Sequence, residues 1–142
     1  MQVTREEIIA TIDTAWDAWK AALDGIPPHL TSEPGVCGYF SIKDLIGHIA
    51  FWDEQDLARA HKLAAGEQVA PNDWATMNDR DYTAHKDDTL ETLITRMSDA
   101  HSRLRADVRT FERLEDLRLD ETWEHYDGHR DDVLAWRAAE GV

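Results

Sequence analysis

Residues 122–136 read T-W-E-H-Y-D-G-H-R-D-D-V-L-A-W, and the spacing within this stretch predicts an α-helix. Four residues recur every three or four positions and would share one face of that helix: His125, His129, Val133 and Trp136. Two imidazoles four residues apart lie one above the other on a helix, where they can bind a single metal ion. We expect this helix to run from about Asp120 to about Ala139, with Gly141 closing it.

Three other stretches have the spacing of amphipathic helices. The first covers residues 4–23 and opens with the capping box T-R-E-E. The second covers residues 41–65 and opens with the variant box S-I-K-D, and the third covers residues 88–110 and opens with D-T-L-E. The apolar residues that recur at helical spacing, and that we expect in the core, are Ile8, Ile12, Trp16, Trp19, Leu23, Leu45, Ile49, Trp52, Leu90, Leu93, Ile94, Met97, Leu104, Val108 and Phe111.

The two long connections lack sustained helical spacing. Three prolines exclude a regular helix between residues 25 and 40, where we expect an extended crossover. Residues 67–87 are predicted to form a loop with one short helical turn near residues 75–85. No alternating β pattern occurs. The sequence therefore predicts an all-α fold, a four-helix bundle forming one domain over residues 1–142 with a long crossover after its first helix.

The composition restricts the partners and the location that we expect. The 142 residues include 15 Lys and Arg against 29 Asp and Glu, a formal charge of -14. Because this charge repels a phosphate backbone, we expect no nucleic-acid partner.

With one cysteine, Cys37, no leader-like N-terminus and no long apolar stretch, we expect a cytoplasmic protein without membrane contact. Helical bundles commonly pair their faces, so a homodimer is a further expectation.

A third metal ligand would have to come from another helix, and His48 is the best candidate. It lies three residues after Leu45 and four before Trp52, so it faces the same way as these core residues. Taken alone, such a histidine is more often a hydrogen-bonded core residue than a ligand. As a ligand, it needs only to lie at the same level of the bundle as His125 and His129.

Three imidazoles favour a divalent transition metal, Zn or Ni first and Fe or Cu as alternatives, over Mg or Ca. Three protein ligands leave coordination positions open to water or substrate, as in catalytic sites. No catalytic side chain is assigned beyond a metal-bound water or thiolate. We expect Asp132, Trp52 and Trp136 beside the ligands, with Asp132 orienting a histidine or acting as a base.

Trp74 and His101 are expected to be structural residues rather than parts of the site. Trp74 lies in a predicted loop, where we expect it to plug the rim of the core rather than to close a pocket. His101 falls between Met97 and Leu104, so we expect a histidine in or beside the core.

The sequence lacks the motifs of several other enzyme classes. A zincin would have glutamate after the first histidine of H-E-x-x-H, but Tyr126 follows His125. No G-x-S-x-G motif, P-loop or Gly-rich dinucleotide turn is present. The histidines are the one chemical signal left.

Two segments resemble the DinB superfamily in their order and separation: S-I-K-D-L-I-G-H-I-A-F-W-D-E at residues 41–54 and E-T-W-E-H-Y-D-G-H-R-D-D-V-L-A-W at residues 121–136. Members of that family are metal-binding four-helix bundles. Their triad consists of one His in the second helix and H-x-x-x-H in the fourth, which implies that His48, His125 and His129 bind the metal. The resemblance follows the helix order over nearly the whole chain, although the first and third helices match only as amphipathic helices.

Relatives in this family include thiol-dependent S-transferases and isomerases that use low-molecular-weight thiols such as bacillithiol or mycothiol. With a metal-bound water or thiolate as the nucleophile, we expect a metal-dependent S-transferase or hydrolase acting on a small molecule, with a thiol as co-substrate in the first case. The alternatives are a metal binder without turnover and a non-catalytic bundle that binds a small apolar ligand or a protein partner and whose histidines are structural.

Overall fold

The computed structural model describes residues 3–142, and the regular elements within that range are helical. The α-helices are α1 (Arg5–Leu23), α2 (Ile42–Ala64), α3 (Trp74–His85), α4 (Leu90–Val108) and α5 (Asp120–Glu140), and a short 3-10 helix, η1 (Pro28–Leu30), follows α1. The predicted all-α class is confirmed for the described residues. None of the helices described between residues 3 and 142 has the length and apolar character needed to cross a lipid bilayer.

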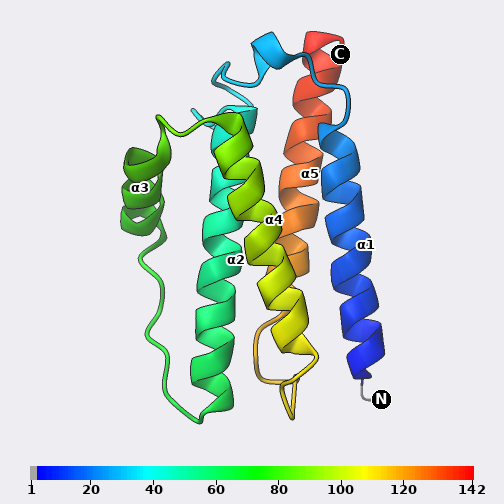
Figure 1. Cartoon of the computed structure of the whole chain (residues 1–142), viewed down its shortest axis with the longest axis vertical. Helices are drawn as coiled ribbons and strands as arrows, with labels where there is room; N and C mark the ends of the chain where they lie inside the picture. Colours follow the sequence, from blue (N-terminus) through cyan, green and yellow to red (C-terminus); the bar gives the residue numbers. More distant parts are fainter. Residues whose placement is uncertain (1–2) are drawn as a thin grey trace.

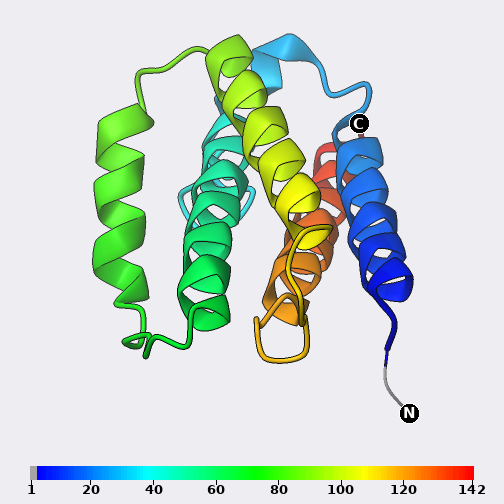
Figure 2. The ribbon, with the colours of Figure 1, turned by 60° about the horizontal axis from the view of Figure 1, so that its bottom comes forward.

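Helices α1, α2, α4 and α5 pack around a shared core (Figure 1). The most extensive contacts join α2 to α4 and α1 to α5, while smaller contacts join α2 to α5 and α1 to α4. Helix α3 lies outside this group and contacts α2 (Figure 2). Helix α2 therefore contacts α3, α4 and α5.

The core contains the apolar faces that the helical spacing predicted. Members of the predicted set with no exposed surface are Ile12, Trp19, Leu45, Ile49, Leu104 and Val108. Gly47 permits the close approach of α2 and α4, because a Cβ at this position would lie 3.3 Å from the Leu93 side chain. One prediction is wrong: Ile94 is 41% exposed. Leu93 takes the inward position, and adjacent helical residues point roughly 100° apart.

Side-chain caps start α1 and α2 as predicted. The Glu7 N–H donates to Thr4 Oγ1 at 3.1 Å, and the Thr4 N–H donates back to the Glu7 carboxylate. Ser41 and Asp44 form the same reciprocal pair at the start of α2. These caps satisfy backbone donors that have no partner within the helix, and they fix where each helix begins.

The cap of α4 lies one residue later than predicted. Thr89, not Asp88, precedes the helix, and its hydroxyl accepts the N–H of Thr92 at 3.1 Å. The Asp88 carboxylate instead lies 2.7 Å from Nδ1 of His85, at the end of α3. The prediction could not separate two adjacent residues that are both good caps.

Helix α3 is longer than the single turn predicted near residues 75–85. It has 12 residues and is capped by Asp73. None of its side chains is buried, so its sequence shows little apolar periodicity. Polar contacts hold it in place: the Trp52 indole of α2 donates to Asn78 at 2.8 Å, and Asp81 pairs with Arg96 of α4 at 3.1 Å.

The connection between α1 and α2 is folded rather than extended, contrary to the prediction. After η1, the chain reverses at Gly38, whose φ of 57° suits glycine. The Phe40 N–H donates to the Cys37 carbonyl at 3.0 Å, and the Val36 N–H donates to the Phe40 carbonyl at 2.9 Å. This turn places the Phe40 ring 5.2 Å from the His48 ring, measured between centroids.

Two arginines join the ends of neighbouring helices. Arg137 of α5 donates to the carbonyls of Ala22 at 2.8 Å and Asp24 at 2.5 Å, at the C-terminal end of α1. Arg5 of α1 donates in the same way to carbonyls at the end of α4. The last carbonyls of a helix lack partners within it and carry partial negative charge, so a guanidinium there is stabilising.

Replacing Arg137 by Met keeps the apolar stem and removes the donors. Because hydrogen bonds to charged groups are lost, we expect the free energy of unfolding to fall by about 1–3 kcal/mol, measured by urea denaturation. The matched control is Arg113→Met, whose side chain is 77% exposed, and which should stay within about 0.5 kcal/mol of the wild type. If the two variants were equally stable, the contact with α1 would have no stabilising role.

Candidate metal centre

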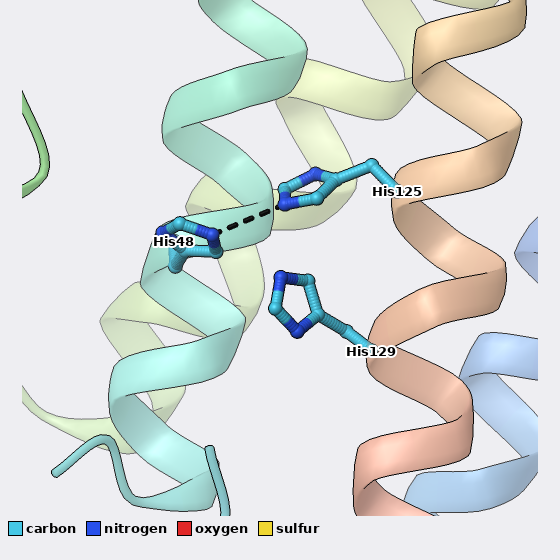
Figure 3. A group of neighbouring side chains, drawn as sticks. All are labelled: His48, His125 and His129. Carbon is cyan, nitrogen blue, oxygen red and sulfur yellow. Dashed lines mark hydrogen bonds between the residues drawn. The ribbon is translucent and has the colours of Figure 1, made fainter. Parts of the chain in front are cut away.

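His48 of α2 and His125 and His129 of α5 converge in the space between the two helices (Figure 3). One ring nitrogen of each lies within 4.8 Å of the other two. Nε2 of His48 and Nε2 of His125 lie 3.1 Å apart. The sequence placed these residues at one site by spacing and by resemblance, and the structure brings them together.

The spacing of the ring nitrogens suits a transition metal. With Zn–N distances of about 2.0–2.1 Å, two nitrogen ligands of a tetrahedral ion lie about 3.3 Å apart. The 3.1 Å between the Nε2 atoms of His48 and His125 is close to this value. The donor set therefore fits a divalent transition metal, which His48, His125 and His129 would hold.

Burial keeps the three imidazoles neutral. It lowers the pKa of His48 to about 3, and the neighbouring His129 adds to the shift. Burial also lowers the pKa of His125 well below its ordinary value and lowers that of His129, although Asp132 acts in the opposite direction there. Neutral imidazoles have the lone pairs that a metal needs, so the site requires no deprotonation near pH 7.

Asp132 and Cys37 also lie close to the His129 ring. The Asp132 carboxylate is 3.0 Å from Nδ1 of His129, so Nε2 is the nitrogen left for a metal. The Cys37 sulfur lies within 4.8 Å of ligand atoms of both residues. Burial and then the charge of Asp132 raise the pKa of this thiol. Nothing in the sequence indicated Cys37, because its position depends on the tight turn before α2.

A cavity of about 450 Å³ opens on the three histidines. Its other lining residues are Trp52, Asp56, Asn72, Trp74, Asn78, Glu121 and Glu124. Trp52, expected beside the site, lines this cavity, whereas Trp136 is in the core and does not. Trp74 does not plug the core rim as expected: its side chain is 64% exposed, and its ring centroid lies 6.0 Å from that of Trp52.

One wall of the cavity is acidic. Asp56 is buried, and desolvation raises its pKa to about 6, although a hydrogen bond from Thr122 and the charge of Arg59 act against this shift. Arg59 also donates to Glu121 at 2.6 Å. Glu124 extends the acidic wall to the exposed surface of α5. The sequence prediction missed these carboxylates, because acidic residues are abundant throughout the chain.

A buried hydrogen-bond chain joins the helices beside this site. The Tyr126 hydroxyl donates to Asp53 at 2.6 Å, so the 2.9 Å contact of Tyr126 with His101 Nδ1 requires the histidine to donate. The His101 ring stacks on Trp16 with centroids 3.8 Å apart. Burial raises the pKa of Asp53 well above its ordinary value. His101 is therefore a core histidine, as expected.

No protein-family model and no curated protein sequence matches this chain. Solved structures do match it. An uncharacterised protein from Escherichia coli UTI89 has a TM-score of 0.80 at 16% identity, covering 100% of this chain and 97% of that one. The colibactin self-resistance protein ClbS, solved in complex with a dsDNA, has a TM-score of 0.77 at 18% identity, covering 95% and 96%. At these identities the similarity shows a shared helical fold.

The expectation that nucleic acid is excluded as a partner is wrong. A protein of the same fold, ClbS, has been crystallised with double-stranded DNA. The error has a physical reason: net charge is a sum over the chain, whereas DNA binding depends on where individual Lys and Arg side chains lie. In this chain Arg103 and Arg109 are exposed on and just after α4 despite the acidic total.

His101 provides a test of the buried chain through pH. Burial lowers its pKa from 6.5 to about 4 in the folded protein. As the pH falls below 6.5, the unfolded chain therefore takes up a proton before the folded protein does, and stability is lost until about pH 4. For His101 alone, this loss approaches about 3 kcal/mol. We expect His101→Asn to be less stable at pH 7 but to lose less stability between pH 6.5 and 4.

The measurement is urea denaturation of the metal-free protein at several pH values. The exposed His29→Asn serves as the control for the chemical change itself. If His101→Asn and wild type lost equal stability over this interval, His101 would not be held neutral by the core.

Proposed function

We propose that the chain is a metal-dependent enzyme of the DinB-like class, either a thiol-dependent S-transferase or a hydrolase. In this proposal His48, His125 and His129 hold a divalent transition metal, Zn or Ni in preference to Fe or Cu. The observation that supports it most directly is the convergence of three neutral imidazoles at a cavity large enough for a small molecule.

The arrangement of the helices supports the DinB-like four-helix type. Four long helices surround the core, and the histidines lie on the second and the last of them. In this interpretation α3 is an addition between the second and third long helices. The two solved structures, at 16% and 18% identity, support the helical fold that this proposal requires.

The side chains around the triad have roles that follow from their positions. A divalent ion bound there would supply Lewis acidity toward a substrate oxygen or thiol. Asp132 would hold the His129 ring by accepting its Nδ1–H. Asp56, with a pKa near 6, can accept or release a proton in the cavity wall. Trp52 and Trp74 would pack against a bound substrate and exclude water.

Metal content tests the proposal at its first step. Purified protein loaded with Zn or Ni and then desalted should retain about one metal ion per chain by elemental analysis. His48→Ala should lose it, because two imidazoles from one helix remain. His61→Ala, whose side chain is 54% exposed and which lies outside the cavity, should retain the metal. If the wild type retains no stoichiometric metal, the enzyme proposal fails.

A screen for turnover follows when the metal is retained. Bacillithiol, mycothiol and glutathione would each be tested with small electrophiles, and ester and amide substrates would be tested without thiol. Turnover that requires both a thiol and His48 indicates the S-transferase. Thiol-independent turnover indicates the hydrolase, and retained metal without turnover indicates a metal binder.

DNA binding is a second candidate function. The observation that favours it is the complex of the fold neighbour ClbS with dsDNA. The basic side chains that this chain could place against phosphates include Arg103 and Arg109, both exposed. On a chain of charge -14, such binding would be weak and would depend strongly on salt.

Fluorescence anisotropy with a short DNA duplex in about 50 mM salt tests this function. We expect the double variant Arg103→Glu and Arg109→Glu to weaken binding and to flatten its salt dependence, because phosphate contacts are lost. The control is Arg80→Glu on the exposed face of α3, which should bind like the wild type. Binding unaffected by the double variant would exclude this surface, and absence of binding would exclude DNA as a partner.

A further inference from the structure

The cavity next to the histidines has an aromatic wall formed by two tryptophans from different helices. Trp52 belongs to α2 and is 9% exposed, whereas Trp74 is the first residue of α3 and is 64% exposed. Their ring centroids lie 6.0 Å apart and their planes differ by 52°, so they form two sides of a corner. The Trp52 indole is fixed, since its N–H donates to Asn78 at 2.8 Å. The large exposed surface of Trp74 is open to a ligand.

The charged groups that line the same cavity are all carboxylates. Asp56, Glu121 and Glu124 contribute to its wall, and no Lys or Arg is among the described lining residues. Arg59 binds Glu121 from outside the lining at 2.6 Å and lies 3.5 Å from Asp56, so these two carboxylates are partly neutralised. Glu124, at the exposed edge, is the carboxylate most available to a ligand.

We infer that the organic ligand of this cavity is a cation, a protonated amine or quaternary ammonium group, that packs on Trp74 and Trp52 and faces Glu124. Indole faces attract cations through the ring quadrupole, and Trp is the strongest aromatic partner for them. A carboxylate in the same cavity adds Coulomb attraction and disfavours anions. This inference names the substrate class of the proposed enzyme, and it rests on that function for the claim that the ligand reacts.

The inference is compatible with a metal at the other wall. The three imidazoles are neutral, so a divalent ion would bring positive charge, and the carboxylates of the same cavity offset it. A bifunctional ligand would place its reacting group at the histidines and its ammonium group at the indoles. The cavity volume of about 450 Å³ is in the range for a small molecule of this kind.

Choline and two isosteres of different charge test the inference in metal-free protein. The neutral isostere is 3,3-dimethylbutan-1-ol, and the anion is 3,3-dimethylbutanoate. Binding is followed by NMR through the indole N–H signals of the six tryptophans, each assigned with a Trp→Phe variant. We expect choline to shift the Trp52 and Trp74 signals and to bind about 10-fold more tightly than the alcohol, with no detectable binding of the anion.

Two substitutions separate the aromatic and the acidic contributions. Trp74→Ala and Glu124→Gln should each weaken choline binding by about 3-fold to 10-fold, and Glu124→Gln should leave the affinity for the alcohol unchanged. The matched controls are Leu134→Ala, an apolar residue of α5 that is 49% exposed, and Glu115→Gln, whose side chain is also 49% exposed. Neither control residue lines the cavity, so both variants should bind choline like the wild type.

The outcomes distinguish this inference from the proposed function. Equal affinity for choline and the alcohol, or choline binding that leaves both indole signals unchanged, overturns the cation inference whether or not metal is retained. Choline selectivity in a protein that retains no metal supports the cation site and overturns the enzyme. Selectivity together with a metal that requires His48 supports both.

Discussion

The donation of the Tyr126 hydroxyl to the buried Asp53 carboxyl is the interaction on which the arrangement of the site depends. It fixes the rotation of α5 against α2, and the contact of Tyr126 with His101 extends this restraint to α4. An unpaired polar group in the core is costly, so the helices cannot rotate without losing these partners. Because His125 precedes Tyr126 directly, the same rotation turns the imidazoles of α5 toward His48.

The cavity has neutral imidazoles on one wall and carboxylates on another. Desolvation keeps the imidazoles neutral, while the carboxylates make the electrostatic potential of the cavity negative. Both features favour a positively charged occupant near pH 7, either a metal ion or an organic cation. No Lys or Arg is among the described lining residues, although Arg59 pairs from outside the lining with two of the carboxylates, Asp56 and Glu121, and partly offsets their charge.

The sequence was sufficient for the core helices and for the three histidines, because both depend on the 3.6-residue period and on contacts within regular elements. It was insufficient where geometry comes from irregular backbone. Cys37 reaches His129 through a turn at Gly38, and Trp74 reaches the cavity because α3 packs with its polar face. The charge argument against DNA failed for a different reason, since a total charge contains no information on the position of each arginine.

Helix α3 has no buried side chain, so its attachment to the other helices is weak. Elements with few buried apolar contacts separate from a protein at low free-energy cost. A ligand that touches both Trp52 and Trp74 would join the rigid core to this helix, and part of its binding free energy would be used to restrict the motion of α3. The affinity of the cavity is thus linked to the stability of α3. Contacts outside the cavity lining, such as the pair between Asp81 and Arg96, would then influence how tightly the ligand binds.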